Sequence, residues 1–423
     1  MRFNYGKIFL LGFGFFGVSV IWATYNAFVP IFLSEKFGLQ PALIGFFMTL
    51  DNIAALLIQP PVGAWSDRLR TPIGRRMPFI LIGAPIGAIA FGLIPLAAVL
   101  PLFVACTTTL LLSMAFWRTP VVALMPDITP SQNRSQANGI INFMGGVGSI
   151  IAFLGGAMLY DINPAYPFWF GSGLVILAAL MVFLFIREPK VNEDSQEERP
   201  SMLTSLKFVL ADTDRSALRV LLAIFFWFVA YNAVEAFFTL YAKNHLQFSE
   251  SGGTRLLGQL SLFFVLFALP SGYLGSRIGR RVTILIGIVI MTLCLLLMYF
   301  TPVATLTTVL TTLPILGEVP VIGLILMIVG IGWACININS LPMVVDMTTV
   351  AYLGTYTGLY YLFSTLAAIA GPIINGWIIQ LSGKDYSTTM VAAPFFMVLA
   401  FIMMLGVRRG EAAPLQGVGE KIS

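Results

Sequence analysis

Twelve runs of apolar residues divide this sequence, and each is about the length that a helix needs to cross a bilayer. We place them at roughly 7–33, 41–65, 77–99, 101–125, 135–160, 165–187, 217–243, 254–275, 282–302, 318–345, 352–380 and 387–407. The chain is 58% hydrophobic and only 10% charged, which sets it apart from soluble domains. The runs predict an all-α membrane protein with twelve transmembrane helices.

One long polar segment separates the sixth run from the seventh. It contains Glu193–Pro200, which is too polar to bury. We therefore predict an N-terminal six-helix half at 1–187, a linker at 188–216, a C-terminal six-helix half at 217–409 and a tail at 410–423. The linker is either a simple tether or holds a short surface helix near Met202–Leu210.

A basic hairpin follows the second run of each half. The first reads Gly63-Ala64-Trp65-Ser66-Asp67-Arg68 and continues to Gly74-Arg75-Arg76; the second reads Gly272-Tyr273-Leu274-Gly275-Ser276-Arg277-Ile278-Gly279-Arg280-Arg281. Tyr25-Asn26-Ala27 in the first run likewise matches Tyr231-Asn232-Ala233 in the seventh. These pairs indicate a transporter built from a duplicated unit.

Positive charge is distributed unevenly between the two sides of the predicted bundle. An even number of spans places both chain ends on one side, and 19 of the 24 lysines and arginines lie there. By the positive-inside rule, both termini are cytoplasmic in a multi-pass protein of the cell membrane.

Two six-helix halves, with a charged loop after the second helix of each, resemble the major facilitator superfamily. Within it, residues 15–190 are similar to the sucrose–proton symporters, which belong to the glycoside–pentoside–hexuronide:cation symporters. The similarity rests on Gln59–Arg68, the widened gap to Gly74-Arg75-Arg76, Pro78-Phe79-Ile80, Pro120 with Ala123–Asp127, and Arg187-Glu188-Pro189. The resemblance implies proton-coupled sugar uptake by alternating access.

The fourth run departs from that pattern. The plant members carry an arginine, needed for sugar, where this chain has Val122, and an acidic residue where it has Leu111. Arg118 stands one helical turn before Val122, on the same face. We expect Arg118 to bind substrate from nearly the same place; snorkelling to the cytoplasmic surface is the alternative.

Two acidic residues lie deep in the predicted spans. Burial favours the neutral form of a carboxyl group, which suits a residue that binds and releases protons, so Asp51 and Glu235 are the proton-coupling candidates. The alternatives are a permanent ion pair of Asp51 with Arg118, and a position for Glu235 in the wetter outer part of its helix.

The resemblance assigns a gating role to the basic hairpins, which hold the cytoplasmic ends of the halves together. In the first hairpin the candidates are Asp67, Arg68, Arg75 and Arg76, with Asp127 at the end of the fourth run. In the second they are Arg277 and Arg281, with Ser276 where an aspartate usually stands, so we expect a weaker clamp. A role in topology alone is the alternative.

Buried amides and aromatic side chains favour a polar substrate, because amides hydrogen-bond hydroxyl groups and aromatic faces pack on sugar rings. Besides Arg118, the substrate candidates are Asn26, Asn142, Tyr231, Asn232, Asn337 and Tyr361. Each could instead join helices, since asparagine does so in membranes. For Trp22 we favour core packing over a place in the site.

No motif of an enzyme or of an ATP-driven pump is present. Gly12-Phe13-Gly14-Phe15-Phe16-Gly17 has dinucleotide-site spacing but lies inside the first run, with no strand before it. One histidine and three scattered cysteines offer no metal-ligand pattern. We expect no enzymatic activity, no cofactor, no metal and no nucleic-acid partner.

The sequence therefore predicts a monomeric secondary transporter that imports a sugar or glycoside with a proton. Sodium stays open as the coupling ion. The alternative is proton-driven export of amphipathic compounds through a cavity lined by some of the 35 phenylalanines and 18 methionines.

Overall fold

The computed structural model describes residues 5–129, 134–188, 214–314, 316–348 and 353–410. Its elements are α1 (Tyr5–Ile31), η1 (Phe32–Lys36), α2 (Pro41–Phe47), α3 (Leu50–Arg68), α4 (Met77–Leu93), η2 (Ile94–Leu96), α5 (Leu100–Ile128), α6 (Arg134–Ile150), η4 (Ile151–Gly155), α7 (Gly156–Ile162), α8 (Tyr166–Phe185), α10 (Ser216–Asn244), α11 (Glu250–Ile278), α12 (Arg280–Phe300), α13 (Val303–Leu306), β1 (Val309–Leu313), β2 (Gly317–Pro320), α14 (Val321–Val345), α15 (Leu353–Leu381), η6 (Tyr386–Thr388) and α16 (Thr389–Leu405). The predicted surface helix at 202–210 and most of the predicted tail lie outside the described residues.

In the part of the chain that the structure describes, twelve helical segments are long and apolar enough to cross a membrane, which confirms the predicted helical class. Each overlaps one predicted run. The tenth begins at Val321 rather than near 318, because the residues before it form the strand β2. The second consists of two helices, α2 and α3, separated by a turn at Met48 and Thr49.

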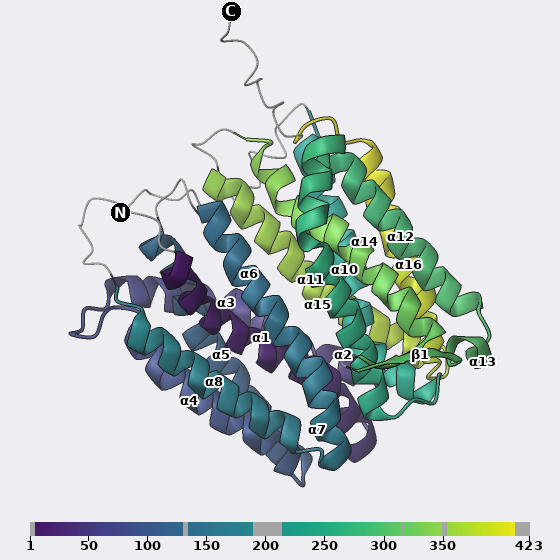
Figure 1. Ribbon diagram of the computed structural model, residues 1–423, viewed down its shortest axis with the longest axis horizontal. Helices are drawn as coiled ribbons and strands as arrows, with labels where there is room; N and C mark the ends of the chain where they lie inside the picture. Colours follow the sequence, from purple (N-terminus) through teal and green to yellow (C-terminus); the bar gives the residue numbers. More distant parts are fainter. Residues whose placement is uncertain (1–4, 130–133, 189–213, 315, 349–352, 411–423) are drawn as a thin grey trace, which may run out of the picture.

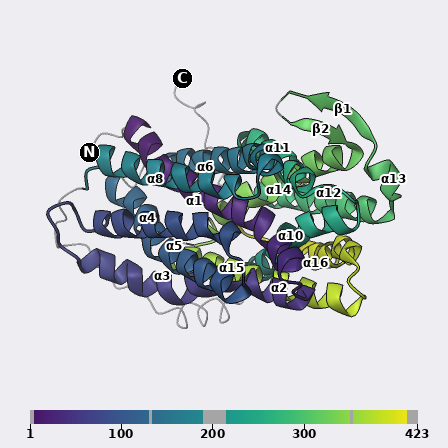
Figure 2. The same ribbon diagram turned by 90° about the horizontal axis from the view of Figure 1, so that it is seen from below.

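The helices of each half lie together, with α1 to α8 on one side and α10 to α16 on the other (Figure 1 and Figure 2). We call the end where α1 begins and α16 ends the terminal face, and the opposite end the far face. The two basic hairpins lie at the terminal face.

Backbones of the two halves touch toward the far face, where α2 packs against α15. A Cβ atom on Gly45 would lie 2.2 Å from the Pro372 carbonyl oxygen, and one on Gly376 would lie 2.5 Å from the Pro41 carbonyl oxygen. The Ala42 N–H donates to Gln380 Oε1 at 3.2 Å. Glycine at both positions therefore permits a contact that any side chain would block.

Ion pairs join the halves at the same face. Lys243 of α10 lies 3.3 Å from Glu35 in the N-terminal half and 2.5 Å from Glu250 in its own half. Arg255 of α11 contacts Asp161 of α7 at 2.5 Å. These side chains are partly exposed, so we expect each pair to add little to the free energy of unfolding. Their main effect should be to favour the conformation in which the halves meet at the far face.

A β-hairpin covers part of this face and was not predicted. Strands β1 and β2 pair antiparallel, and Gln259 Nε2 donates to the Glu318 carbonyl oxygen at 2.9 Å. Leu316 and Val319 pack against Leu154 of the N-terminal half in a small cluster outside the main core. The hairpin thus belongs to one half and contacts the other.

At the terminal face, Arg76 binds two aspartates within the N-terminal half. Its side chain is 6% exposed and lies 2.8 Å from Asp67 and 2.5 Å from Asp127, while Arg75 lies 2.9 Å from Asp127. Arg68 is exposed. Four of the residues proposed for gating, Asp67, Arg75, Arg76 and Asp127, thus lie together around the buried Arg76 guanidinium.

Glu188 holds the same turn from the end of the sixth span. Its carboxylate accepts the backbone N–H groups of Arg75, Arg76 and Met77, each at 2.9 Å, at the start of α4. Gly74 has φ +118° there, and a Cβ would lie 2.5 Å from Glu188. An acidic group at a helix N-terminus satisfies free donors and matches the helix dipole.

The second hairpin is held differently. Arg280 pairs with Asp346, whereas Arg281 donates to the carbonyl oxygens of Met404 and Leu405 at 3.1 and 2.7 Å. Arg277 lies over the Tyr273 ring at 4.9 Å. Among the described residues, every ion pair at the terminal face stays within one half, whereas those at the far face include pairs that cross between halves.

We predict that Gly45→Leu separates the halves at the far face, because the side chain has no room beside Pro372. A cysteine placed at Gln380 should then react several times faster with a membrane-impermeant maleimide. Gly173→Leu is the matched control, since nothing lies within 4 Å of a Cβ there. Equal labelling of the two variants would refute the predicted contact.

We predict that Asp127→Asn lowers stability more than Asp67→Asn. Asp127 is 15% exposed and contacts both arginines, whereas Asp67 is 56% exposed. Loss of charged hydrogen bonds at the first site should cost about 1.5–3 kcal/mol, and at the exposed site under about 1 kcal/mol. Thermal unfolding in detergent measures both; a larger effect of Asp67→Asn would contradict the assignment.

Candidate functional site

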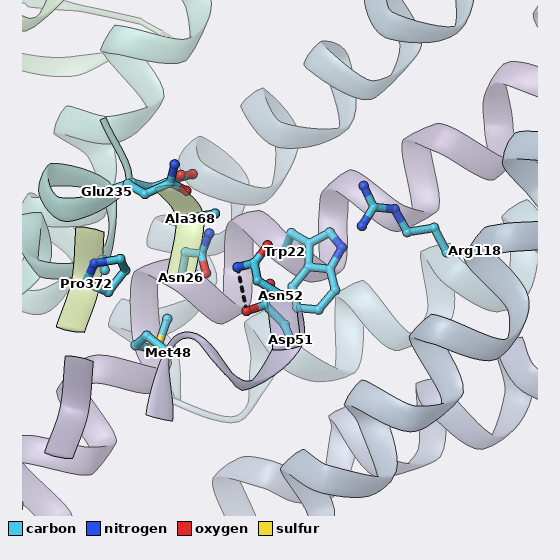
Figure 3. Close-up of a pocket in the computed structure, with 11 residues that line it drawn as sticks. Trp22, Asn26, Met48, Asp51, Asn52, Arg118, Glu235, Ala368 and Pro372 are labelled. Atoms are coloured by element: carbon cyan, nitrogen blue, oxygen red, sulfur yellow. Dashed lines mark hydrogen bonds between the residues drawn. The ribbon is translucent and has the colours of Figure 1, made fainter. Parts of the chain in front are cut away.

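A cavity of about 270 Å³ lies between the two halves (Figure 3). Helices α1, α3 and α5 contribute from one half and α10 and α15 from the other. The residues that line it are Trp22, Asn26, Met48, Asp51, Asn52, Arg118, Asn232, Glu235, Ala236, Ala368 and Pro372. Five of the predicted substrate and proton residues thus meet at one place: Asn26, Asp51, Arg118, Asn232 and Glu235.

The break between α2 and α3 presents Asp51 at this cavity. Thr49 precedes α3, and its hydroxyl donates to the Phe46 carbonyl oxygen at 2.7 Å. Asp51 therefore lies in the first turn of α3, and its carboxylate accepts a hydrogen bond from the Asn52 side-chain amide at 2.8 Å. A helix N-terminus inside the protein stabilises a negative group, as in the broken helices of transporters.

Glu235 faces the cavity from α10, in the opposite half. The Asn26 side-chain amide lies near its carboxylate, so polar groups of the two halves face each other inside the cavity. Asn232 lies one turn earlier, but its amide donates to the Phe228 carbonyl oxygen at 2.7 Å. The paired asparagines of the sequence repeat are therefore used differently, one across the cavity and one within its own helix.

Arg118 lies at one end of the group in Figure 3 and Glu235 at the other. Among the described residues, Arg118 has no carboxylate within ion-pair distance, although Asp51 and Tyr361 are near enough to interact electrostatically. The permanent ion pair with Asp51 is thus absent in this conformation. A guanidinium with five donors and no bound acceptor can take a polar group of a ligand.

Four predicted substrate residues do not line the cavity. Asn142 is exposed on α6, Asn337 is half-buried on α14, and Tyr361 is 56% exposed on α15. Tyr231 stacks on Trp333, with ring centroids 3.9 Å apart, and belongs to an aromatic cluster of the C-terminal half.

Trp22 and Asn52 line the cavity but were not among the predicted site residues. Trp22 stands one helical turn before Asn26, so the spacing alone places the two on one face. Asn52 follows Asp51 directly, and only the break in the second span explains why both face the cavity.

Chemically, the cavity offers two carboxylates that can exchange a proton, amides that can bind hydroxyl groups, and one guanidinium. No group of three or more potential metal ligands occurs in the part of the chain that the structure describes.

Sequence comparison relates the chain to transporters of two kinds. "Multidrug resistance protein 1" of Bacillus subtilis (strain 168) is 25% identical over 219 residues, which are 52% of this chain and 54% of that protein. "Sucrose transport protein SUT4" of Oryza sativa subsp. indica is 28% identical over 163 residues, 33% of this chain and 27% of that protein. The chain thus matches about half the length or less of these relatives.

Structural comparison extends over nearly the whole fold. A bacterial homologue of the human lysosomal transporter Spinster, described as inward-facing and occupied, has a TM-score of 0.74 at 17% identity, covering 98% of this chain and 100% of that chain. The nucleoside transporter NupG has a TM-score of 0.69 at 17% identity, covering 96% and 100%. The sequence pattern of the family described as "Major Facilitator Superfamily" matches residues 11–317 and 260–422. This chain belongs to the Major Facilitator Superfamily.

Proposed function

We propose that this secondary transporter imports a sugar or glycoside together with a proton. The observation that carries the proposal is the polar character of the cavity. Six of its eleven lining residues bear an amide or an ionisable group: Asn26, Asp51, Asn52, Arg118, Asn232 and Glu235. Such a lining suits a hydroxyl-rich solute, because each polar group can pair with a hydroxyl once water is displaced.

Glu235 is the stronger of the two proton-coupling candidates. Asp51 lies at a helix N-terminus that stabilises its charged form, whereas Glu235 lies inside a continuous helix and faces the Asn26 amide of the other half. Proton transfer at Glu235 would change a contact that joins the halves, which links ion binding to their relative position.

We further propose that the terminal face is cytoplasmic and that the structure represents an inward-facing form. The excess of lysine and arginine near that face supports the orientation. The inter-half contacts of Gly45, Gly376, Lys243 and Arg255 at the far face support closure there. In the outward-facing form, the hairpin of Arg76 would contact the opposite half. This fits the gating role that we propose for Asp67, Arg68, Arg75, Arg76, Asp127, Arg277 and Arg281.

Export of amphipathic compounds is the second candidate. Its support is the match to Multidrug resistance protein 1, which extends over a larger share of this chain than the match to the sucrose transporter. The cavity lining argues against it, because Trp22 alone is aromatic and Met48 is its one methionine.

Transport assays in proteoliposomes with a panel of substrates distinguish sugar import from export of amphipathic compounds. With an inwardly directed proton gradient, we expect accumulation of at least one sugar among sucrose, maltose and aryl glucosides, and its loss when the gradient is collapsed. Gradient-driven movement of ethidium, without movement of any sugar, would instead support export.

We predict that Arg118→Ala abolishes accumulation of the transported sugar, because Arg118 supplies the one guanidinium among the described residues that line the cavity. Membrane insertion should be intact, since the chain loses a charge that is costly inside the bilayer. Uptake at the wild-type rate by a correctly inserted variant would exclude a role for Arg118.

We predict that Glu235→Gln uncouples the substrate from the proton. The amide keeps the shape and polarity of the side chain but cannot exchange a proton, so sugar exchange should persist while accumulation is lost. Asp51→Asn is the comparison and should impair accumulation less. If both variants accumulate sugar with the wild-type pH dependence, neither residue couples the proton.

A further inference from the structure

We infer that Trp22 is the platform on which the ring of the substrate stacks, and that it thereby selects cyclic sugars. The inference rests on the proposed function and assigns to Trp22 a contact with substrate, in place of the core packing that we expect from the sequence. Among the described residues that line the cavity, Trp22 alone carries an aromatic ring.

The indole is held in a fixed orientation. Tyr25, which is 1% exposed, meets it edge-on, with centroids 5.8 Å apart and planes at 82°. In Figure 3 the indole lies between Asp51 and Arg118. A rigid aromatic face contributes binding without a large loss of side-chain freedom.

A tryptophan at this position leaves one polar group unpaired. Its Nε1–H is buried and has no acceptor among the described residues, and such an unpaired group is unfavourable. A phenylalanine would fill space without that cost. The repeat in the other half has one: Phe228 precedes Asn232 by four residues, as Trp22 precedes Asn26.

Phe228 packs inside its own half, edge-on against Trp333 with centroids 5.4 Å apart. It does not line the cavity. The two related positions have therefore diverged, and the larger, more electron-rich ring lies on the side that faces the ligand space.

The surroundings of Trp22 match the two kinds of surface on a pyranose. The C–H groups of a sugar ring pack on an aromatic face, while its hydroxyl groups point outward around the rim. Asn26, Asn52 and Arg118 line the same cavity around the indole and can bind that rim. A closed sugar ring, with C–H groups gathered on one face, thus fits the platform better than an open-chain polyol with equally many hydroxyl groups.

The test is sugar binding to purified protein by calorimetry and by tryptophan fluorescence, with sucrose and maltose as probes. We expect Trp22→Leu to weaken binding about tenfold and Trp22→Phe by no more than about threefold, in line with the worth of an aromatic contact. Sugar should change the fluorescence of the wild type, and this change should be lost in Trp22→Phe although the sugar still binds.

Trp227→Phe is the matched control. Its indole Nε1–H is also buried without an acceptor, but Trp227 is 0% exposed and does not line the cavity. This variant should keep both the affinity and the sugar-induced fluorescence change. Thermal midpoints without sugar show whether each variant is folded.

The outcomes are distinct. A wild type that binds none of the sugars overturns the proposed function and this inference with it. A wild type that binds a sugar, with unchanged affinity in Trp22→Leu, overturns the inference alone. A fluorescence change that survives in Trp22→Phe, or is lost in Trp227→Phe, places the ring elsewhere and also overturns it.

Discussion

Charged side chains are costly inside a bilayer, and this protein gathers three of them around one cavity. The arrangement is possible because each has a different local support. Asp51 lies at the N-terminus of α3, Glu235 lies near the Asn26 amide, and Arg118 is near enough to Asp51 to interact with it electrostatically. Without the break in the second span, Asp51 would lie in a continuous helix with no free backbone donors.

The two ends of the bundle are held by different means. At the terminal face each half is braced internally, by Arg76 in one and Arg280 in the other. At the far face the halves are joined to each other by close backbone contact, ion pairs and the packing of the β-hairpin. Movement between alternative forms requires the second set of contacts to break, while the first set can stay intact within each half.

Much of this architecture is predictable from the sequence, because apolar length and charge bias are strong signals in membranes. The twelve spans follow from them, and the repeated Tyr-Asn-Ala segments indicated two residues that do reach the cavity, Asn26 and Asn232. The break at Thr49 did not follow, since no glycine or proline marks it. The positions of Asn142 and Tyr361 outside the cavity could not be predicted from the sequence either. Which face of a long apolar helix turns toward the cavity depends on the helices that pack against it.

The glycines of α2 and α15 have a consequence for the speed of conformational change. Where two helices meet through interlocked side chains, parting them requires many rotamers to rearrange together. Gly45 and Gly376 instead bring main chain against main chain, and the surfaces there have few side-chain rotamers to reorganise. Such a contact can open and close repeatedly with little rearrangement of side chains. A transporter passes through one conformational cycle for each molecule that it moves, and this contact can close the far face tightly and still separate quickly.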